Sequence, residues 1–231
     1  MITSVLLDIE GTVGDIAFVR EVLFPYARRR IAQTLQRRWG DPEIGAITAE
    51  AAHAAGSALA RPDAAAAQFL AWMDQDRKVR PLKNLQGIIW REGYASGELK
   101  AHLYPDAIEA MAMWRKKGLR LFIYSSGSLE AQKLYFEHSV AGNLASAIDG
   151  YFDTTTGPKT EADSYLKISA TIKAPPASIL FLTDAPTEVA AAAKAGLQVR
   201  RIDRTRAPAY VGEEGGTTVL GSFASLAAAP G

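Results

Sequence analysis

The chain has 231 residues, of which 48% are hydrophobic and 22% charged, as in an ordinary globular protein with one domain or a core and a smaller insert. Its formal net charge is +1, so no overall field favours binding to nucleic acid or to an anionic membrane. It contains no cysteine, which excludes disulfides, thiolate metal sites and a cysteine nucleophile.

Targeting and membrane signals are missing from the sequence pattern. No apolar run approaches the ~18 residues that span a bilayer, and the first residues start a strand pattern rather than a signal peptide. We therefore expect a cytoplasmic protein with no membrane partner and no nucleic-acid partner, and we expect it to be a monomer.

The first predicted strand, Ser4–Ile9, runs into Asp8-Ile9-Glu10-Gly11-Thr12. Side chains two positions apart on extended backbone point the same way, and a glycine lets the chain turn sharply after them. Two carboxylates at such a corner can hold a hard divalent cation, and a carboxylate beside that cation can attack phosphorus to form an aspartyl-phosphate. The alternative is a solvated strand end followed by an ordinary turn.

Residues from about Phe18 to Glu92 contain helix formers and almost no strand signal, including the alanine-rich stretch 46–67. We predict a helical insert that returns to the core through residues 93–97. The arginines at 28–30 and 37–38 are expected to form a solvated helix face.

The remaining chain alternates strand and helix patterns, which predicts a doubly wound α/β fold with a parallel sheet and right-handed crossovers. The further strands are predicted at Leu119–Tyr124, Ala147–Phe152, Ser178–Thr183 and Gln198–Ile202. The helices are predicted at Pro105–Lys117, Leu129–His138, Asp163–Ile172 and Thr187–Ala195. After Gly212 we expect weak order, apart from a strand or helix near Val219–Leu226.

Three further polar signals lie beyond predicted strand ends or in a loop. Ser125 and Ser126 open a helix after a strand, where hydroxyls and backbone N–H groups can bind an anion. Asp184 closes another strand, and Lys159 lies in a turn-rich loop. Taken singly, these residues could be a helix cap, a turn residue and a solvated surface charge.

Together the signals converge, because ligands of an open parallel sheet bind outside the carboxyl ends of its strands, at the point where the strand order reverses. That edge would gather a nucleophile, a metal cage, hydroxyl donors and a cation from Asp8, Glu10, Ser125, Ser126, Asp184 and Lys159. Phosphoryl transfer needs little more, since its catalysis is mostly positioning and charge neutralisation.

The order Asp-x-Glu-Gly-Thr, Ser-Ser-Gly, Lys and Thr-Asp resembles the four motifs of haloacid-dehalogenase-type phosphatases. Glu10 stands where that superfamily usually has a second Asp, and this narrows the resemblance to the enolase-phosphatase E1 family of methionine salvage. Longer strings carry it over about residues 4–204: Leu23-Phe24-Pro25-Tyr26, Gly97-Glu98-Leu99-Lys100-Ala101-His102-Leu103-Tyr104-Pro105-Asp106, Ile123-Tyr124-Ser125-Ser126-Gly127-Ser128, Tyr151-Phe152-Asp153-Thr154-Thr155 and Phe181-Leu182-Thr183-Asp184.

Two stretches depart from the family pattern. Val13-Gly14-Asp15 stands where Thr and Pro usually follow, and residues 201–206 replace an expected Arg-Pro-Gly-Asn segment. Both are expected near the mouth of the site, where they would affect substrate fit and rate.

The resemblance implies a haloacid dehalogenase-like core at 1–17 and 98–231 with a helical cap at 18–97. It implies an Mg²⁺-dependent enzyme that enolises 2,3-diketo-5-methylthiopentyl-1-phosphate, a small phosphorylated diketone, and then hydrolyses the ester to acireductone. Asp8 would be the nucleophile, and Asp8, Glu10 and Asp184 would form the metal site. Glu10 would also move protons, while Ser125, Ser126 and Lys159 would hold the phosphate, which makes Asp8, Glu10 and Lys159 the catalytic set.

Several alternatives stay open at this stage. The chain could be a capped phosphomonoesterase without enolase activity, or an inactive domain that binds a phosphorylated ligand. His102 and His138 could be catalytic bases or structural residues. An apolar wall for the thioether tail, or plain helix packing, could explain Phe18, Val19, Leu23 and Phe24.

Overall fold

The computed structural model describes residues 1–227, and the chain forms two compact units. The sheet unit comprises Met1–Phe18 and Lys100–Gly231, and the helical unit comprises Val19–Leu99. No helix within the described part of the chain is both long and apolar enough to cross a membrane.

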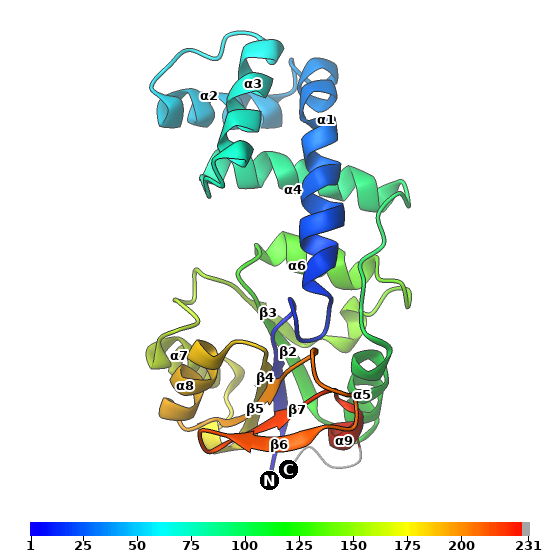
Figure 1. Ribbon diagram of the computed structural model, residues 1–231. Helices are drawn as coiled ribbons and strands as arrows, with labels where there is room; N and C mark the ends of the chain where they lie inside the picture. Colours follow the sequence, from blue (N-terminus) through cyan, green and yellow to red (C-terminus); the bar gives the residue numbers. More distant parts are fainter. Residues whose placement is uncertain (228–231) are drawn as a thin grey trace. The chain divides into compact units, whose positions relative to one another are not determined.

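One seven-stranded sheet forms the centre of the sheet unit, in the order β3-β2-β1-β4-β5-β7-β6 (Figure 1). Every neighbouring pair is parallel except β6 and β7. The strands are β1 (Ser4–Leu7), β2 (Arg120–Tyr124), β3 (Gly150–Phe152), β4 (Ile179–Thr183), β5 (Gln198–Ile202), β6 (Val211–Glu214) and β7 (Thr217–Leu220). The chain moves outward from β1 through β2 to β3, then returns to the other side of β1 with β4, so the strand order reverses at β1.

Helices cover the sheet on both faces. They are α5 (Pro105–Lys116), α6 (Leu129–Glu137), α7 (Ala162–Ile172), α8 (Pro186–Lys194) and α9 (Ala224–Ala227), with short 3₁₀ turns η2 (Ala145–Ala147) and η3 (Pro176–Ser178). Leu6, Phe122 and Phe181 share one buried cluster with residues of α7 and α8. They are paired in register on β1, β2 and β4, so their side chains face the same side of the sheet. Trp114 of α5 is fully buried, with its ring 5.8 Å from that of Phe223.

The predicted doubly wound α/β fold is confirmed, and all five predicted strands are present within a few residues of their expected bounds. Near Val219–Leu226, where a strand or helix was expected, the structure has the end of β7 and the start of α9. The expectation of weak order is wrong for residues 213–218. Instead of weak order, β6 and β7 form an antiparallel hairpin that extends the sheet, turning at Gly215 and Gly216, which both have positive φ. The expectation for residues 228–231 lies outside the described residues.

The helical unit contains most of the π-helical segment η1 (Phe18–Leu23) and four α-helices: α1 (Phe24–Arg37), α2 (Pro42–Ala55), α3 (Pro62–Asp74) and α4 (Arg80–Ala95). Each α-helix has a proline at its first or second position. In α2, α3 and α4 the preceding residue is extended, so the missing N–H costs no helical hydrogen bond. The alanine-rich stretch is divided between α2 and α3, which are separated by the left-handed Gly56 at the end of α2.

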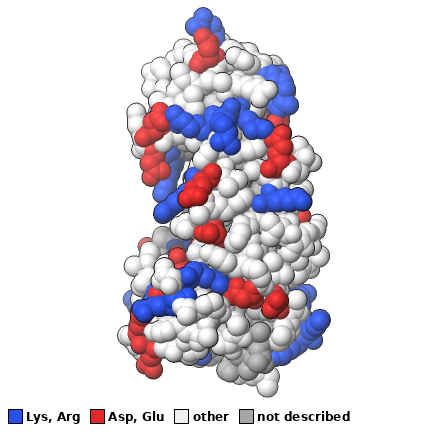
Figure 2. All heavy atoms as spheres, turned by 45° about the vertical axis from the view of Figure 1, so that its right-hand side comes forward, with Lys and Arg blue, Asp and Glu red and all other residues white. Residues whose placement is uncertain are grey.

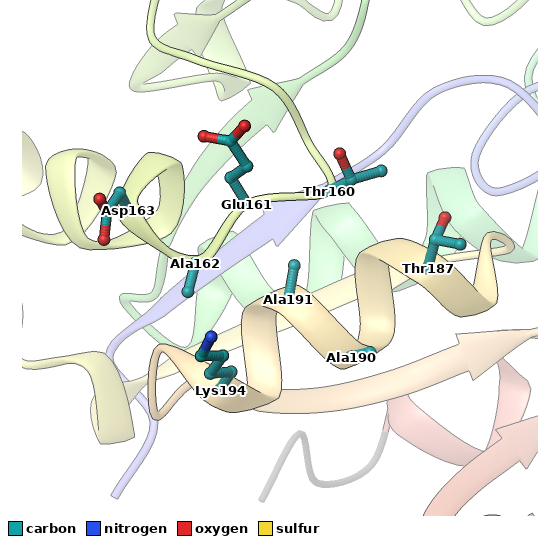
Figure 3. Close-up of a pocket in the computed structure, with 8 residues that line it drawn as sticks. All are labelled: Thr160, Glu161, Ala162, Asp163, Thr187, Ala190, Ala191 and Lys194. Carbon is teal, nitrogen blue, oxygen red and sulfur yellow. The ribbon is translucent and has the colours of Figure 1, made fainter.

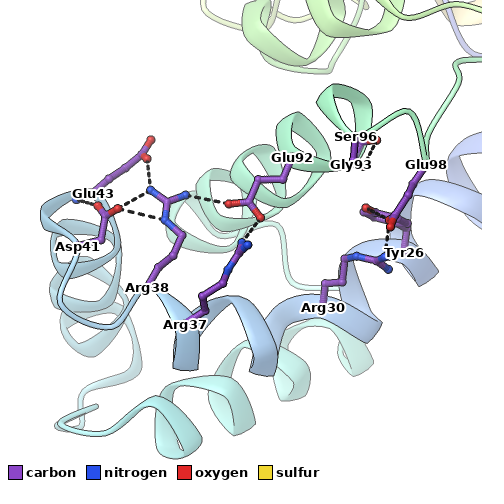
Figure 4. A network of polar contacts seen from close by, with 10 residues as sticks. All are labelled: Tyr26, Arg30, Arg37, Arg38, Asp41, Glu43, Glu92, Gly93, Ser96 and Glu98. Carbon is purple, nitrogen blue, oxygen red and sulfur yellow. Dashed lines mark hydrogen bonds and ion pairs between the residues drawn. The ribbon is translucent and has the colours of Figure 1, made fainter.

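A network of ion pairs joins α1, α2 and α4 within the helical unit (Figure 4). Arg38 contacts Asp41 at 2.7 Å, Glu43 at 3.0 Å and Glu92 at 3.3 Å, and Arg37 also pairs with Glu92. The predicted solvated face therefore does not describe Arg38, whose side chain is only 21% exposed.

Candidate active site

The strand register brings the predicted site residues to one edge of the sheet. Leu7 of β1 pairs with Ile123 of β2 and with Leu182 of β4, all in parallel. Asp8, Ser125 and Asp184 therefore follow three adjacent strands at the same carboxyl edge, beside the reversal of strand order. The backbone N–H of Asp8 also donates to the carbonyl of Leu182 at 3.0 Å, which ties the start of the loop to β4.

A tight turn follows β1 and fixes the direction of its two acids. The Ile9 carbonyl accepts hydrogen bonds from the N–H groups of Val13 and Gly14, and the Gly11 N–H donates to the Gly14 carbonyl at 2.8 Å. Gly11 has φ of +73°, and a Cβ at this position would lie 2.3 Å from Oδ2 of Asp184. Only glycine fits here, because the backbone is left-handed and a carboxylate packs against it.

Asp8 is buried and pairs with Lys159. The Lys159 ammonium lies 2.5 Å from Oδ1 of Asp8, and the hydroxyl of Thr12 donates to the other oxygen, Oδ2, at 3.3 Å. The same ammonium lies 2.8 Å from Oε2 of Glu188, which also accepts a hydrogen bond from Thr183 at 2.6 Å. The fold thus places Lys159 in contact with Asp8, the predicted nucleophile, although the two residues are 151 positions apart in the chain.

The loop that carries Lys159 is held from two sides. Tyr165 of α7 donates its hydroxyl to the carbonyl of Lys159 at 2.7 Å, and Tyr124 at the end of β2 donates to the Gly157 carbonyl at 2.9 Å. Burial alone would lower the pKa of the Lys159 ammonium, but the carboxylates of Asp8 and Glu188 outweigh it and raise that pKa above its ordinary value. Lys159 is therefore a fixed positive charge rather than a solvated surface lysine.

The neighbouring acids hold their protons more tightly than usual. Burial, and then the negative charge of Asp8, raise the pKa of the Glu10 carboxyl to about 7. The same two causes raise the pKa of Asp184 and of Glu188. An acid with a pKa near neutrality can both donate and accept a proton at the pH of the cell.

Ser125 and Ser126 follow β2 as predicted, but they differ in environment. Ser125 is buried and its hydroxyl oxygen accepts a hydrogen bond from the N–H of Gly127 at 3.2 Å, which leaves its O–H directed elsewhere. Ser126 is exposed. The amide of buried Gln132 donates to the carbonyls of Gly127 at 2.8 Å and Phe152 at 2.9 Å, fixing the loop between β2 and α6.

Sequence reasoning missed Glu188, Thr12 and Gln132 as site residues. Glu188 lies one helical turn after Asp184, in the first turn of α8, and that spacing could have placed it at the same edge. Thr12 lies within the motif Asp8–Thr12, but the motif alone did not predict its hydrogen bond to Asp8. Gln132 bonds to the loop just before its own helix and to Phe152 of β3, and the contact with β3 could not be read from local sequence.

The histidines and the departures have structural contacts in the sheet unit. Nδ1 of His102 accepts the N–H of Asp15 at 3.2 Å, and its carbonyl accepts the hydroxyl of Tyr135. A Cβ at Gly14 would meet that hydroxyl and the His102 carbonyl, so the departure at 13–15 is a close-packed corner. His138 follows α6 as its C-terminal cap residue.

Two of the residues proposed for an apolar wall also have aromatic partners. Phe18 packs edge-on against Tyr135 at 5.9 Å in the sheet unit. Phe24 packs edge-on against Trp90, also at 5.9 Å, within the helical unit. These contacts are those of ordinary packing, and each ring has its partner inside its own unit.

The carboxylates of Asp8, Glu10 and Asp184 are suitable ligands for a hard cation, although they are not arranged as a complete metal site. Among the residues that the structure describes, no three His, Cys, Asp or Glu side chains are gathered tightly enough to hold a metal ion as they stand. Carboxylate oxygens are nevertheless the ligands that Mg²⁺ prefers. The contact of Asp184 with Gly11 brings it beside the loop that carries Glu10. Burial and the charge of Asp8 raise the pKa of both acids, and a divalent cation would offset this accumulated negative charge.

The surface adds one hollow outside this edge. A shallow pocket of about 410 Å³ lies between α7 and α8, lined by Thr160, Glu161, Ala162, Asp163, Thr187, Ala190, Ala191 and Lys194 (Figure 3). It contains none of the predicted site residues. On the face in Figure 2, positive and negative side chains occur beside one another, as the near-zero net charge suggests.

Known proteins resemble the chain over most of its length. Residues 2–196 match the family of haloacid dehalogenase-like hydrolases. The chain is 49% identical to "Enolase-phosphatase E1" of Alcanivorax borkumensis over 90% of its length and 92% of that protein. It is 47% identical to the protein of the same name from Aquifex aeolicus, over 86% and 89% respectively.

Solved structures give the same result for the fold. UTR4 protein of Saccharomyces cerevisiae matches with a TM-score of 0.81 and 37% identity, covering 96% of this chain and 99% of that one. L-2-haloacid dehalogenase of Xanthobacter autotrophicus matches with a TM-score of 0.58 and 18% identity, covering 99% and 98%, which shows the fold alone.

The glycine at the turn of the acidic loop can be tested directly. Gly11→Ala should lower the free energy of unfolding by about 1–3 kcal/mol, because the new Cβ needs a left-handed backbone and displaces the Asp184 carboxylate. Thermal unfolding of the metal-free protein measures this. Gly127→Ala is the control, since its Cβ would make only an ordinary 3.7 Å contact. Equal melting temperatures for Gly11→Ala and wild type would contradict the described loop.

Proposed function

Because the chain belongs to the enolase-phosphatase E1 family of haloacid dehalogenase-like hydrolases, we propose how its own residues perform that family's two reactions. The enzyme converts 2,3-diketo-5-methylthiopentyl-1-phosphate to acireductone and phosphate in methionine salvage, by enolisation followed by ester hydrolysis. The observation that carries the assignment of roles is the buried Asp8–Lys159 pair at 2.5 Å, beside Glu10 and Asp184.

Asp8 is the nucleophile of the hydrolytic step in this proposal. An oxygen of its carboxylate forms a bond to phosphorus, and the bond from phosphorus to the substrate's ester oxygen breaks. The result is an aspartyl-phosphate and the released enol. Water then attacks phosphorus, which frees phosphate and restores the carboxylate. Thr12 and Lys159 keep the Asp8 side chain in one orientation while it waits for substrate.

Glu10 moves the protons of both reactions. In hydrolysis it gives a proton to the leaving ester oxygen and then takes one from the attacking water. In the metal-free protein, burial and the charge of Asp8 raise its pKa to about 7. In enolisation we assign it the proton of the carbon next to the carbonyl, which it takes from that carbon and returns to the carbonyl oxygen as the enol forms. Its side chain is one methylene longer than aspartate, a displacement of more than ~1 Å, which matters at this scale of positioning.

The phosphate is held by Lys159, Ser125 and Ser126. Lys159 is already charged and buried, so its ammonium can turn from Asp8 to a phosphate oxygen and offset charge in the transition state. The buried Ser125 O–H is free to donate, because the oxygen's acceptor role is taken by Gly127. Asp8, Glu10 and Asp184 would hold Mg²⁺, which when bound polarises the carbonyl oxygens and neutralises phosphate charge.

We also propose that residues 18–97 serve as a cap for the catalytic core formed by 1–17 and 98–231. A cap excludes water during reaction, which strengthens the electrostatic contributions of the site. The protein would act as a cytoplasmic monomer on this one small substrate.

The assay follows enol absorbance in the ultraviolet and phosphate release together, with Mg²⁺ and then with EDTA. Wild type should show both signals only with Mg²⁺. Asp8→Asn should release phosphate at less than about 10⁻³ of the wild-type rate, because an amide is a poor nucleophile. Asp163→Asn, an exposed acid of α7, is the matched control.

The outcomes of this assay distinguish the proposed function from its two alternatives. Phosphate release without any enol signal would identify a plain phosphomonoesterase, and no release at all would identify a phosphate-binding domain. Full activity of Asp8→Asn would contradict the role of Asp8. Residual enolisation in Asp8→Asn would show that the two steps use different groups.

The raised pKa of Glu10 predicts how pH acts on the metal-free protein. Between the ordinary value of 4.5 and about 7, the folded state keeps a proton that the unfolded state has lost, so the free energy of unfolding falls as pH rises. Mg²⁺ binds the deprotonated acids, so it should raise the melting temperature more at pH 8 than at pH 5.5. At about 100 times its Kd, the rise at pH 8 should be about 5–10 °C.

Glu10→Gln should flatten the dependence of melting temperature on pH in the metal-free protein, because it removes this titration. Glu161→Gln, an exposed carboxyl in the loop before α7, should keep the wild-type slope. An Mg²⁺-induced shift of the same size at both pH values would contradict the assignment of Glu10 to the metal site.

A further inference from the structure

We propose that Arg204 is a positioning residue that clamps the nucleophile loop of residues 8–14, and that phosphoryl transfer depends on it. This consequence for the reaction rests on the proposed function. Nε of Arg204 donates to the carbonyl oxygen of Thr12 at 3.1 Å, and Nη2 donates to the same oxygen at 2.6 Å. The two residues are 192 positions apart, and the Arg204 side chain is only 14% exposed.

The guanidinium is itself held from other segments of the sheet unit. Nη1 donates to Oδ2 of Asp106, at the start of α5, at 2.7 Å. The carbon at the centre of the guanidinium lies 4.0 Å from the ring centre of Tyr104 and 5.1 Å from that of Phe223. Oδ2 of Asp106 also accepts the N–H of Phe223 at 2.7 Å. A planar, stacked fork with three directed donors is a geometry that lysine cannot reproduce.

The position of the Thr12 carbonyl affects the orientation of Asp8. The hydroxyl of the same residue donates to Oδ2 of Asp8, and Thr12 is completely buried. Fixing the carbonyl therefore fixes the peptide plane from which that hydroxyl extends. A misplacement of about 1 Å at a reacting group can cost roughly a hundredfold in rate, so loss of the clamp should reach the nucleophile without any contact to substrate.

The clamp comes from the segment in which this chain departs from the family pattern. Arg204 lies among residues 201–206, which replace the expected Arg-Pro-Gly-Asn segment. The other charges of this segment face each other and the hairpin: Arg206 pairs with Asp203 and Glu214, and Arg201 pairs with Glu214. Among the contacts of these three arginines, those of Arg204 reach the nucleophile loop. Residues 201–206 therefore contribute, through Arg204, a contact that holds the nucleophile loop.

The test compares Arg204→Met and Arg204→Lys with wild type in steady-state phosphate release. Both should lower kcat by about 10–100-fold while KM changes by less than about threefold, because the clamp orients Asp8 and does not bind substrate. Guanidinium added at millimolar concentration should restore part of the activity of Arg204→Ala. Arg206→Met is the matched control, since its side chain is 46% exposed and its partners lie in its own segment and hairpin. It should keep wild-type kcat.

Hydrogen–deuterium exchange gives a readout that does not use activity. The N–H groups of Gly11, Val13 and Gly14 are hydrogen-bonded within the loop, so exchange over residues 9–17 should accelerate in Arg204→Met. Exchange over β4 should stay unchanged.

A wild-type kcat in Arg204→Met, or loss of protection throughout the sheet unit, would overturn the proposal. If wild type releases no phosphate from the diketone phosphate, the proposed function fails, and the exchange experiment still decides whether Arg204 clamps the loop.

Discussion

The structure of the site depends on the buried ion pair between Asp8 and Lys159, because the Lys159 ammonium offsets the charge of several carboxylates that lie close together. Asp8, Glu10, Asp184 and Glu188 lie around a single ammonium, and three of them have raised pKa values. Removing carboxylates from water is costly unless a cation offsets their charge. Such a cluster lowers the stability of the empty protein, and it is the arrangement that a phosphate-transferring site with a divalent cation needs.

The backbone around this charge is fixed by contacts from distant parts of the chain. The register of β1 with β2 and β4 sets the edge, Gly11 permits the turn, and Tyr165 holds the loop of Lys159. Arg204 completes the set from the opposite end of the sequence by binding the Thr12 carbonyl. Each of these elements acts on the position of Asp8, so preorganisation is distributed through the sheet unit rather than confined to the motif.

Much of the fold and part of the site could be predicted from sequence. Continuous apolar runs predicted five of the seven strands, and the rule for parallel sheets placed Asp8, Ser125 and Asp184 at one edge. The hairpin of β6 and β7 was missed, because Gly215 and Gly216 sit in a stretch of low-complexity composition. The spacing of Glu188 from Asp184 could have indicated its place, but its partner Lys159 is distant in sequence. The contact of Arg204 with Thr12 could not be predicted, because it joins residues 192 positions apart. The assignment of residues 18–97 as a cap stays a prediction.

The most direct measurement is a crystal structure of the protein with Mg²⁺ and beryllium fluoride, which mimics a phosphoryl group bonded to an aspartate. We expect beryllium attached to an oxygen of Asp8, Mg²⁺ shared by Asp8 and Asp184, and the Lys159 ammonium turned onto a fluoride. Beryllium fluoride bound elsewhere, or Mg²⁺ that touches only one of these two acids, would contradict it.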